Sequence, residues 1–246
     1  MKSIEDLSRD QIIRMIGVAF KNIISHTGLW FRETEYQLGI EKALQIDNQA
    51  WQRGFPIQIR RLAKYFGLEV DEQGIPVTLK NMGKETLISL FTDLAKNWIA
   101  NDGVWFQAVE QQEDMFVAKR CNDTAWTRFT VIEAHRIMEA VGIPKNGGLE
   151  ALKQALGYRL YARLNVQEIV EENENSFLFR MNDCRVQSAR KRAGLPDYPC
   201  KSGGLVEYSY FARAIDPRIK TTCVGCPPDP HPEEWWCAWR FEIPNP

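Results

Sequence analysis

The sequence has no excess of charge of either sign. Its 246 residues include 31 Lys and Arg against 32 Asp and Glu, which gives a formal net charge of −1. This balance excludes a protein that holds nucleic acid through bulk positive charge, and it argues against an acidic solvating tail. Hydrophobic residues make up 44% of the chain and aromatic residues 11%. We therefore expect an ordered globular protein with a real core, as one large domain or two small ones.

Long apolar runs are absent as well. No stretch of about 18 consecutive apolar residues occurs, so we expect no membrane-spanning helix. The first residues, MKSIEDLSRDQIIRM, carry charges in every turn and lack the apolar centre of a signal peptide. These features predict a cytoplasmic protein with neither a membrane nor a nucleic acid as partner. Its cysteines are then expected to be reduced thiols or metal ligands, because the cytosol does not sustain structural disulfides.

Several common functional motifs are missing too. The chain contains no G-x-x-x-x-G-K-[ST] and no strand-anchored G-x-G-x-x-G, which excludes the nucleotide-phosphate loops of those types. It also contains no G-x-S-x-G, the motif that positions a serine nucleophile on a strand-to-helix turn. Internal repeats and low-complexity tracts are not found either. Any function must therefore rest on less regular groups of residues.

Hydrophobic spacing predicts helices first and a mixed region after them. Helices are expected over residues 8–24, 30–51, 57–66, 85–109, 114–141 and 149–164, with breaks at 25–28, 54–56 and 101–103. Short β-type runs follow at 166–170 and 177–181, then helices at 185–193 and 204–215, and strands at 219–224 and 235–243. The expected fold class is α+β. A helical N-terminal region (1–108) precedes an α+β metal-binding domain (109–246) with a small antiparallel sheet.

The cysteines are concentrated near the C-terminus, and four of them predict a metal site: Cys200, Cys223, Cys226 and Cys237. Cys223 and Cys226 form a C-x-x-C pair that can bind one tetrahedral ion, and two further thiolates close the shell of a structural zinc. An iron–sulfur cluster is the alternative, because thiolates also hold clusters. Asp229 or His231 could replace one thiolate. The simplest alternative is a set of buried free thiols. Cys121, far from the others in sequence, is expected not to be a ligand.

Cys184 follows a β-type run and precedes a basic helix. A thiol at a helix N-terminus near cations can have a lowered pKa, so Cys184 is a candidate nucleophile. The alternative is a small residue packed at a strand–helix corner. The basic residues beside it could also receive an anionic substrate such as a carboxylate.

A ligand pocket is predicted beside the metal site. The expected helix over 114–141 carries Trp126, Phe129 and His135, and the β-type run at 177–181 carries Phe177 and Phe179. If this helix packs against the sheet, the aromatic residues line a largely apolar cavity, and His135 could act as an acid or base there. The alternative is that Trp126 belongs to the core.

The C-terminal pattern resembles two known families. The quoted stretches are FRMNDC ending at Cys184, Ala193-Gly194-Leu195, Cys200, Cys223-x-x-Cys226, and Cys237-Ala-Trp-Arg-Phe241. They resemble the closing part of the 4-vinyl-reductase-type domain and are similar to the L-2-amino-thiazoline-4-carboxylic acid hydrolase family. The resemblance covers about residues 110–246. This sequence departs from it in the longer loop before Cys237 and at Cys223, which we match to a glutamate.

The resemblance implies a zinc site beside an apolar pocket for a small organic ligand. The first functional hypothesis is accordingly a zinc-stapled, ligand-binding protein. The second is a hydrolase that opens a cyclic C–N bond, with Cys184 as nucleophile or a metal-bound water as the attacking group. The third is an electron-transfer or iron–sulfur protein. Because no output module accompanies the domain, a sensor of this kind would act through a partner or as a homodimer.

Overall fold

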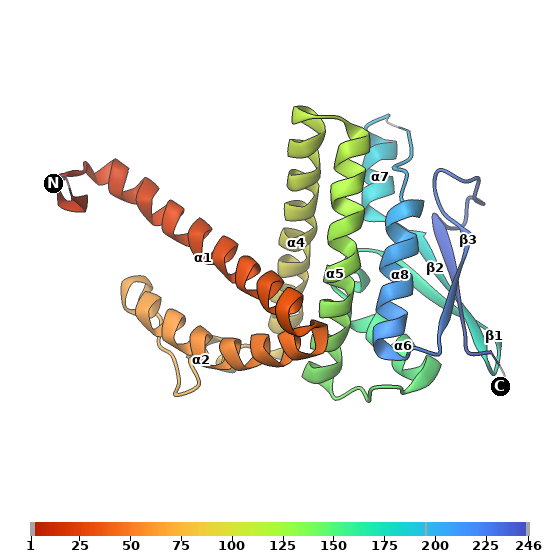
Figure 1. Ribbon diagram of the computed structural model, residues 1–246, viewed down its shortest axis with the longest axis horizontal. Helices are drawn as coiled ribbons and strands as arrows, with labels where there is room; N and C mark the ends of the chain where they lie inside the picture. Colours follow the sequence, from red (N-terminus) through yellow and green to blue (C-terminus); the bar gives the residue numbers. More distant parts are fainter. Residues whose placement is uncertain (1–2, 195, 245–246) are drawn as a thin grey trace. The chain divides into compact units, whose positions relative to one another are not determined.

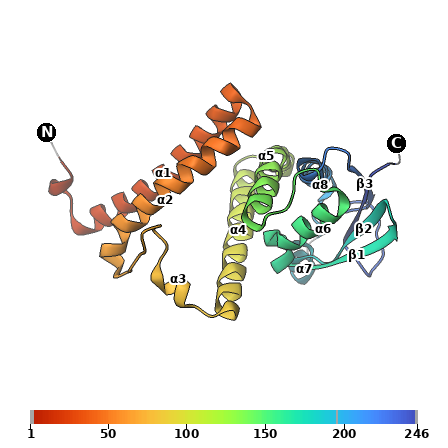
Figure 2. The same cartoon turned by 90° about the horizontal axis from the view of Figure 1, so that it is seen from below.

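The computed structural model of the protein describes residues 3–194 and 196–244 (Figures 1 and 2). The chain divides into two compact units, which meet in sequence at Met82 and Gly83. The predicted boundary at 108/109 differs from this division, because both residues lie within the single helix α4 (Lys84–Gln112). That helix packs against the next one, α5, so the pair belongs to one unit.

Unit 1 is built around two long helices, α1 (Arg9–Leu38) and α2 (Ile40–Phe66), preceded by a short 3-10 turn (Ile4–Asp6) and followed by α3 (Val77–Asn81). Ser8 caps α1 by accepting a hydrogen bond from the backbone N–H of Gln11 (3.3 Å). Gly39, with φ of 81°, separates the two helices, and Gly67, with φ of 64°, ends α2. α1 and α2 contact each other, but α1 has no buried residue among the described residues.

The breaks predicted inside these helices do not occur. α1 continues through residues 25–28, and Thr27 Oγ1 donates to the carbonyl of Ile23 (2.8 Å), so the hydroxyl has a partner within the helix. Pro56 lies inside α2, where the chain after the helix returns and packs Gly74 (φ 78°) against the proline ring. The predicted bend at 101–103 likewise falls within a continuous helix. Tertiary packing and local hydrogen bonds outweigh weak helix breakers at these points.

Unit 2 combines helices with a four-stranded sheet. Its elements are α4, α5 (Met115–Val141), α6 (Gly148–Tyr158), a 3-10 turn (Leu160–Arg163), β1 (Val166–Asn173), β2 (Ser176–Asp183), α7 (Arg185–Arg192), α8 (Lys201–Ile215), β3 (Lys220–Gly225) and β4 (Cys237–Glu242). The strand order is β1-β2-β4-β3, and every neighbouring pair is antiparallel. Figure 2 shows α6 and α8 between α5 and the sheet. The predicted α+β class is confirmed. Of the helices in the described residues, none is long and apolar enough to cross a bilayer.

The core of unit 2 lies between the sheet and α8. Phe177 pairs with Phe241 and Phe179 with Trp239 in the β2–β4 register, and these side chains are buried. Met181 pairs with Cys237 at the end of the same row. Residues two apart on a strand share a face, so this row places Cys237 at the edge of an aromatic core.

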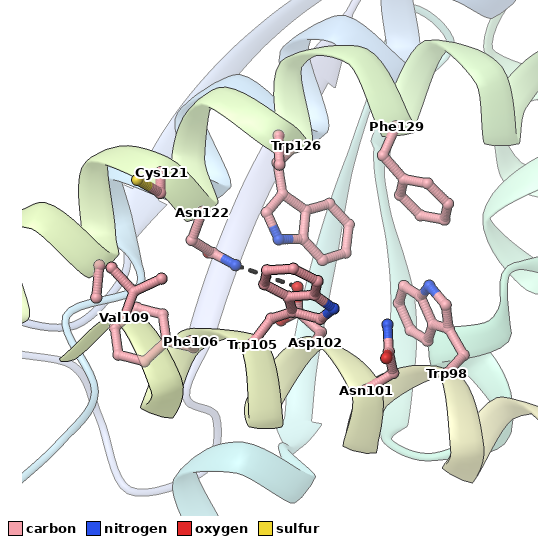
Figure 3. A pocket seen from close by; sticks show the side chains of 12 residues that line it. Trp98, Asn101, Asp102, Trp105, Phe106, Val109, Cys121, Asn122, Trp126 and Phe129 are labelled. Atoms are coloured by element: carbon pink, nitrogen blue, oxygen red, sulfur yellow. Dashed lines mark hydrogen bonds between the residues drawn. The ribbon is translucent and has the colours of Figure 1, made fainter. Parts of the chain in front are cut away.

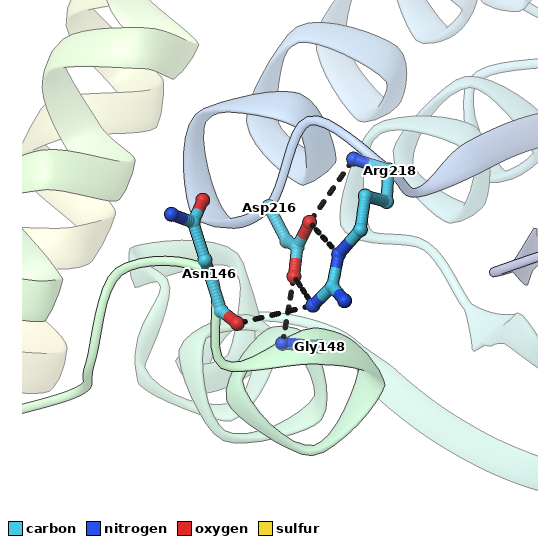
Figure 4. Close-up of polar contacts among 4 residues, drawn as sticks. All are labelled: Asn146, Gly148, Asp216 and Arg218. Atoms are coloured by element: carbon cyan, nitrogen blue, oxygen red, sulfur yellow. Dashed lines mark hydrogen bonds and ion pairs between the residues drawn. The ribbon is translucent and has the colours of Figure 1, made fainter.

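A buried carboxylate joins the end of α8 to the start of α6 (Figure 4). Asp216 Oδ2 accepts from the backbone N–H of Gly148 (3.0 Å) and from Arg218 Nη2 (2.6 Å). Its Oδ1 accepts from the backbone N–H and the Nε of Arg218, both at 3.0 Å. Arg218 also donates to the carbonyl of Asn146 (3.2 Å). These bonds, first among them those from the Arg218 side chain, lower the pKa of Asp216.

Replacing Asp216 with asparagine is expected to lower the free energy of unfolding by about 1–2 kcal/mol, because a buried group loses charge-assisted bonds. The folded-state pKa of Asp216 is lowered, so its contribution is present above the ordinary value of 3.8 and is lost as the pH falls below it. Urea unfolding of both proteins at neutral and acid pH measures this. A difference that persists unchanged at the lowest pH would contradict it.

Candidate functional site: a thiol-lined cavity

An inner cavity of about 450 Å³ lies within unit 2. Side chains from α4, α5, α7, α8 and β4 line it, together with residues of the loops between them. Its wall includes the aromatic residues Phe106, Trp126, Tyr161, Tyr198, Tyr208 and Trp239. Its size, and a wall that combines aromatic rings with polar groups, are those of a small-molecule site.

Four thiols converge on this cavity from four elements: Cys184, Cys200, Cys226 and Cys237. The first two precede α7 and α8, the third follows β3, and the fourth begins β4. Cys226 and Cys237 are hydrogen-bonded to each other, and Gln187 Nε2 donates to Cys200 Sγ (3.1 Å). Cys223, predicted as part of the metal shell, lies on β3 and is not among the residues lining the cavity.

Three of the cavity thiols, those of Cys184, Cys200 and Cys226, are held in their neutral form. Burial raises the pKa of Cys184 to about 11, and it outweighs the backbone N–H groups of Gln187 and Val186, which lower the pKa. Burial also raises the pKa of Cys200. The pKa of Cys226 is raised by its hydrogen bond with Cys237 and by burial. The lowered pKa expected of Cys184 at a helix N-terminus is thus not found, because burial dominates there.

These surroundings predict an order of alkylation. Iodoacetamide at neutral pH is expected to modify exposed Cys121 at least tenfold faster than Cys184 or Cys226, since the thiolate is the reactive form and the cavity restricts access. Peptide mass spectrometry of a time course measures each site separately. Modification of Cys184 as fast as that of Cys121 would show that its thiol is activated.

A buried ion-pair network lies beside the cavity. Arg159 Nε contacts Glu133 Oε2 (2.9 Å), and Arg159 Nη1 contacts Glu207 Oε1 (2.7 Å). The arginine side chain is 2% exposed and lies over the rings of Phe211 (4.6 Å to the centroid) and Tyr161 (5.4 Å). Glu207 lines the cavity, and burial raises the pKa of its carboxyl group. The network therefore sets the charge of one cavity wall.

Two hydrogen-bond donors of the cavity wall have no partner among the residues that the structure describes. Trp239 Nε1 and Asn165 Nδ2 are both buried without a hydrogen bond in the structure. The Oδ1 of Asn165 accepts from the backbone N–H of Arg185 (2.8 Å), which orients the side chain. Trp239 packs directly against Gly204 of α8, where a Cβ atom would lie 2.5 Å from its ring. Buried polar groups are almost always satisfied, so these two donors point to an acceptor that a ligand could supply.

An outer cavity of about 320 Å³ lies between α4 and α5 (Figure 3). Its wall includes Trp98, Trp105 and Val109, with Phe129 from α5. Figure 3 shows Trp126 and Phe129 reaching from α5 toward α4. Four residues line both cavities: Asp102, Phe106, Asn122 and Trp126. Asn122 Nδ2 donates to Asp102 Oδ1 (3.1 Å) where the two cavities meet. Burial raises the pKa of this aspartate.

The residues predicted to line one pocket do not all lie in the same place. Trp126 lines both cavities and Phe129 the outer one. Phe177 and Phe179 belong to the core between the sheet and α8, and they line neither cavity. His135 lies on α5, half-buried and outside both linings.

Sequence reasoning missed much of the cavity wall. Tyr161, Tyr208 and Trp239 reach the cavity from elements far apart in the chain, and only the pairing of these elements reveals it. One local signal was present. The Gly203-Gly204 pair lies at the start of the helix predicted over 204–215, and Gly204 leaves room on α8 for the Trp239 ring.

The metal prediction stays a prediction. In the parts of the chain that the structure describes, no three His, Cys, Asp or Glu side chains stand in an arrangement that could hold a metal ion. The donor chemistry nevertheless suits a soft cation, because Cys200, Cys226 and Cys237 belong both to the predicted shell and to the cavity wall.

Comparison with known proteins gives a family but no activity. No curated protein and no solved structure matches the chain. One family model matches nearly all of it, in two segments that cover residues 5–82 and 80–243. The junction of these segments lies close to the division between the two units. The chain therefore belongs to the family of unknown function DUF6125.

Proposed function

We propose that unit 2 binds a small organic molecule in the inner cavity. The observation that carries this proposal is the convergence of aromatic rings, thiols and two unsatisfied donors on one cavity of about 450 Å³. A cavity kept only as a packing defect would be apolar and would not hold buried donors without partners. Apolar walls with a few polar groups are typical of sites that orient a ligand.

A cysteine-held metal ion, zinc in the first place, is the second candidate. It is favoured by the Cys226–Cys237 hydrogen bond and by the presence of Cys200 in the same cavity wall. Zinc would replace the thiol protons and cross-link α8 to β3 and β4. Metal analysis and an absorption spectrum of anaerobically purified protein decide between the options. A colourless protein with zinc favours the zinc site, a brown protein with iron and sulfide favours a cluster, and absence of metal leaves the thiols free.

Hydrolysis of a cyclic C–N bond is less well supported. The resemblance to the amino-thiazoline-carboxylate hydrolases suggests it, and Cys184 would be the nucleophile. A thiol with a pKa of about 11 is almost entirely protonated at neutral pH, so it would need a bound substrate or cation to activate it. We therefore propose ligand binding, rather than catalysis, as the function of the inner cavity.

A thermal-shift screen of small molecules on the full chain tests the binding proposal. Ala189, an exposed residue of α7 in the cavity wall, offers a way to obstruct the site. For a compound that raises the melting temperature, Ala189→Trp is expected to weaken binding at least tenfold. Arg192→Trp, on the same helix but outside the cavity lining, is the matched control and should bind like the parent protein. Equal binding by all three proteins would place the compound elsewhere.

A further inference from the structure

The walls of the two cavities differ in polarity, and the inner one carries more of the polar and charged side chains. The outer cavity is lined mainly by the rings and side chains of Trp98, Trp105, Val109 and Phe129. Four thiols, the unsatisfied donors and most of the charged side chains line the inner cavity, whereas Cys121 lines the outer one. Because Phe106 and Trp126 belong to both walls, the two cavities adjoin rather than lie on opposite sides of a packed core. A ligand that spans both would meet a more polar wall in the inner cavity and a more apolar wall in the outer one.

The inner cavity is better suited to an anion than to a cation. Its unsatisfied atoms without an ion pair, Trp239 Nε1 and Asn165 Nδ2, are donors. Of its three carboxylates, Glu207 is engaged by Arg159 and Asp102 by Asn122, and the third, Glu110, lies on α4. Its cationic side chains are Lys96, Lys119, Arg185 and Arg190. Of these, Lys119 is paired with Asp123 (2.8 Å), whereas Arg185 has no ion-pair partner among the described residues and adjoins Asn165 through its backbone N–H.

From this arrangement we propose that the site takes an amphiphilic monocarboxylic acid, with its carboxylate in the inner cavity and its apolar arm in the outer cavity between α4 and α5. This inference rests on the proposed binding function and adds the chemical class of the ligand. The carboxylate would accept from Asn165 Nδ2 or Trp239 Nε1 and lie near Arg185. The arm would pass the contact between Asp102 and Asn122 and cover the rings of Trp98 and Trp126.

Isothermal titration of the full chain with butyrate, octanoate and dodecanoate tests the apolar arm. Each methylene removed from water is expected to tighten binding about fourfold, so dodecanoate should bind roughly 250-fold more tightly than octanoate if the outer cavity accepts the four added carbons. Octanol, with the same chain and no charge, tests the head group. It is expected to bind at least tenfold more weakly than octanoate.

Two variants of α5 test whether the apolar arm of the ligand lies in the outer cavity. Ala125 is exposed and lines the outer cavity alone, so Ala125→Trp fills that cavity without reaching the inner one. Dodecanoate should then lose at least tenfold in affinity, while butyrate should be unaffected. Thr124→Trp puts the same side chain at an exposed neighbouring position outside both linings and should leave every acid unchanged.

Three results would overturn the inference: affinity independent of chain length, equal binding of octanol and octanoate, or equal weakening by the two tryptophan variants. Failure of every acid to bind would also overturn it. That failure would leave the proposed function to be judged by the thermal-shift screen with Ala189→Trp, which uses compounds of any class. The two proposals can therefore fail separately.

Discussion

Replacing Arg159 with methionine is expected to lower the free energy of unfolding of unit 2 by about 3–5 kcal/mol. The arginine is the shared partner of Glu133 and Glu207, whose side chains are only 7% and 12% exposed. Methionine can fill much of the volume between the aromatic rings, but it leaves two buried carboxyl groups without a cation. Removing one partner of a buried ion pair is costly because the remaining charge keeps its desolvation penalty. Chemical unfolding followed by far-UV circular dichroism measures the loss.

The same variant should have a distinctive pH dependence. The folded-state pKa of Glu207 is already raised above 4.5, and loss of Arg159 should raise it further. A group with a raised folded pKa contributes stability below its unfolded value and loses it as the pH rises. The deficit of Arg159→Met should therefore shrink as the pH is lowered from 7 toward about 4.5, the ordinary value. Lys96→Met, which removes an exposed ion pair with Asp93, should change stability by less than about 1 kcal/mol. A deficit that is independent of pH would contradict the role given to the network.

The second large effect is expected at Gly204. A Cβ atom there would lie 2.5 Å from Cζ2 and 3.0 Å from Cη2 of Trp239, whose side chain is fully buried and cannot move aside. Gly204→Val should therefore separate α8 from the sheet and lower the free energy of unfolding by about 3 kcal/mol. Because Trp239 and Gly204 both line the inner cavity, ligand binding should fall as well.

Gly157 provides the matched control. It lies in α6, is exposed, and has no atom within 4 Å of the position that a Cβ would occupy. Valine and glycine differ little in helix propensity, so Gly157→Val should change stability by only about 0.5 kcal/mol. Thermal unfolding of both variants makes the comparison. Similar losses at the two positions would mean that contact with Trp239 is not what requires glycine at position 204.

Local signals predicted the elements of unit 2 well. Asp114 caps α5 by accepting from the backbone N–H of Val117 (2.7 Å), and Gly142, with φ of 74°, ends the helix as predicted. The β-type runs at 166–170 and 177–181 lie within β1 and β2. These features depend on residues close in sequence, so sequence patterns predict them.

Unit 1 was predicted less well because weak helix breakers were given too much weight. Gly28 lies within a helix in which nothing approaches its Cα, and Pro56 is accommodated by the loop containing Gly74. The actual division between α1 and α2 lies at Gly39, whose positive φ ends the first helix. The residues around Gly39 do not distinguish it from the other glycines of unit 1. Its role in ending α1 depends on how α2 packs against α1, which the local sequence does not show.

The set of four cysteines that line the inner cavity could be predicted only in part from the sequence. Clustering of Cys200, Cys226 and Cys237 could be expected from their spacing. The inclusion of Cys184 depends on strand register, since Met181 lies opposite Cys237 and the chain continues for three residues from there to Cys184. The position of Cys223 outside the cavity lining depends on the same sheet. The register of distant strands is not contained in local patterns, so the composition of the site could not be derived from the sequence.

Protection of individual cysteines by a bound compound tests the central claim most directly. The full chain is alkylated with iodoacetamide in the presence and absence of a saturating amount of the compound that gives the largest thermal shift, and each site is followed by peptide mass spectrometry. Binding in the inner cavity predicts that alkylation slows at the four cavity thiols, Cys184, Cys200, Cys226 and Cys237, while half-buried Cys223 on β3 reacts at its original rate. Unchanged alkylation of the cavity thiols, or equal slowing of Cys223, would contradict binding in the inner cavity.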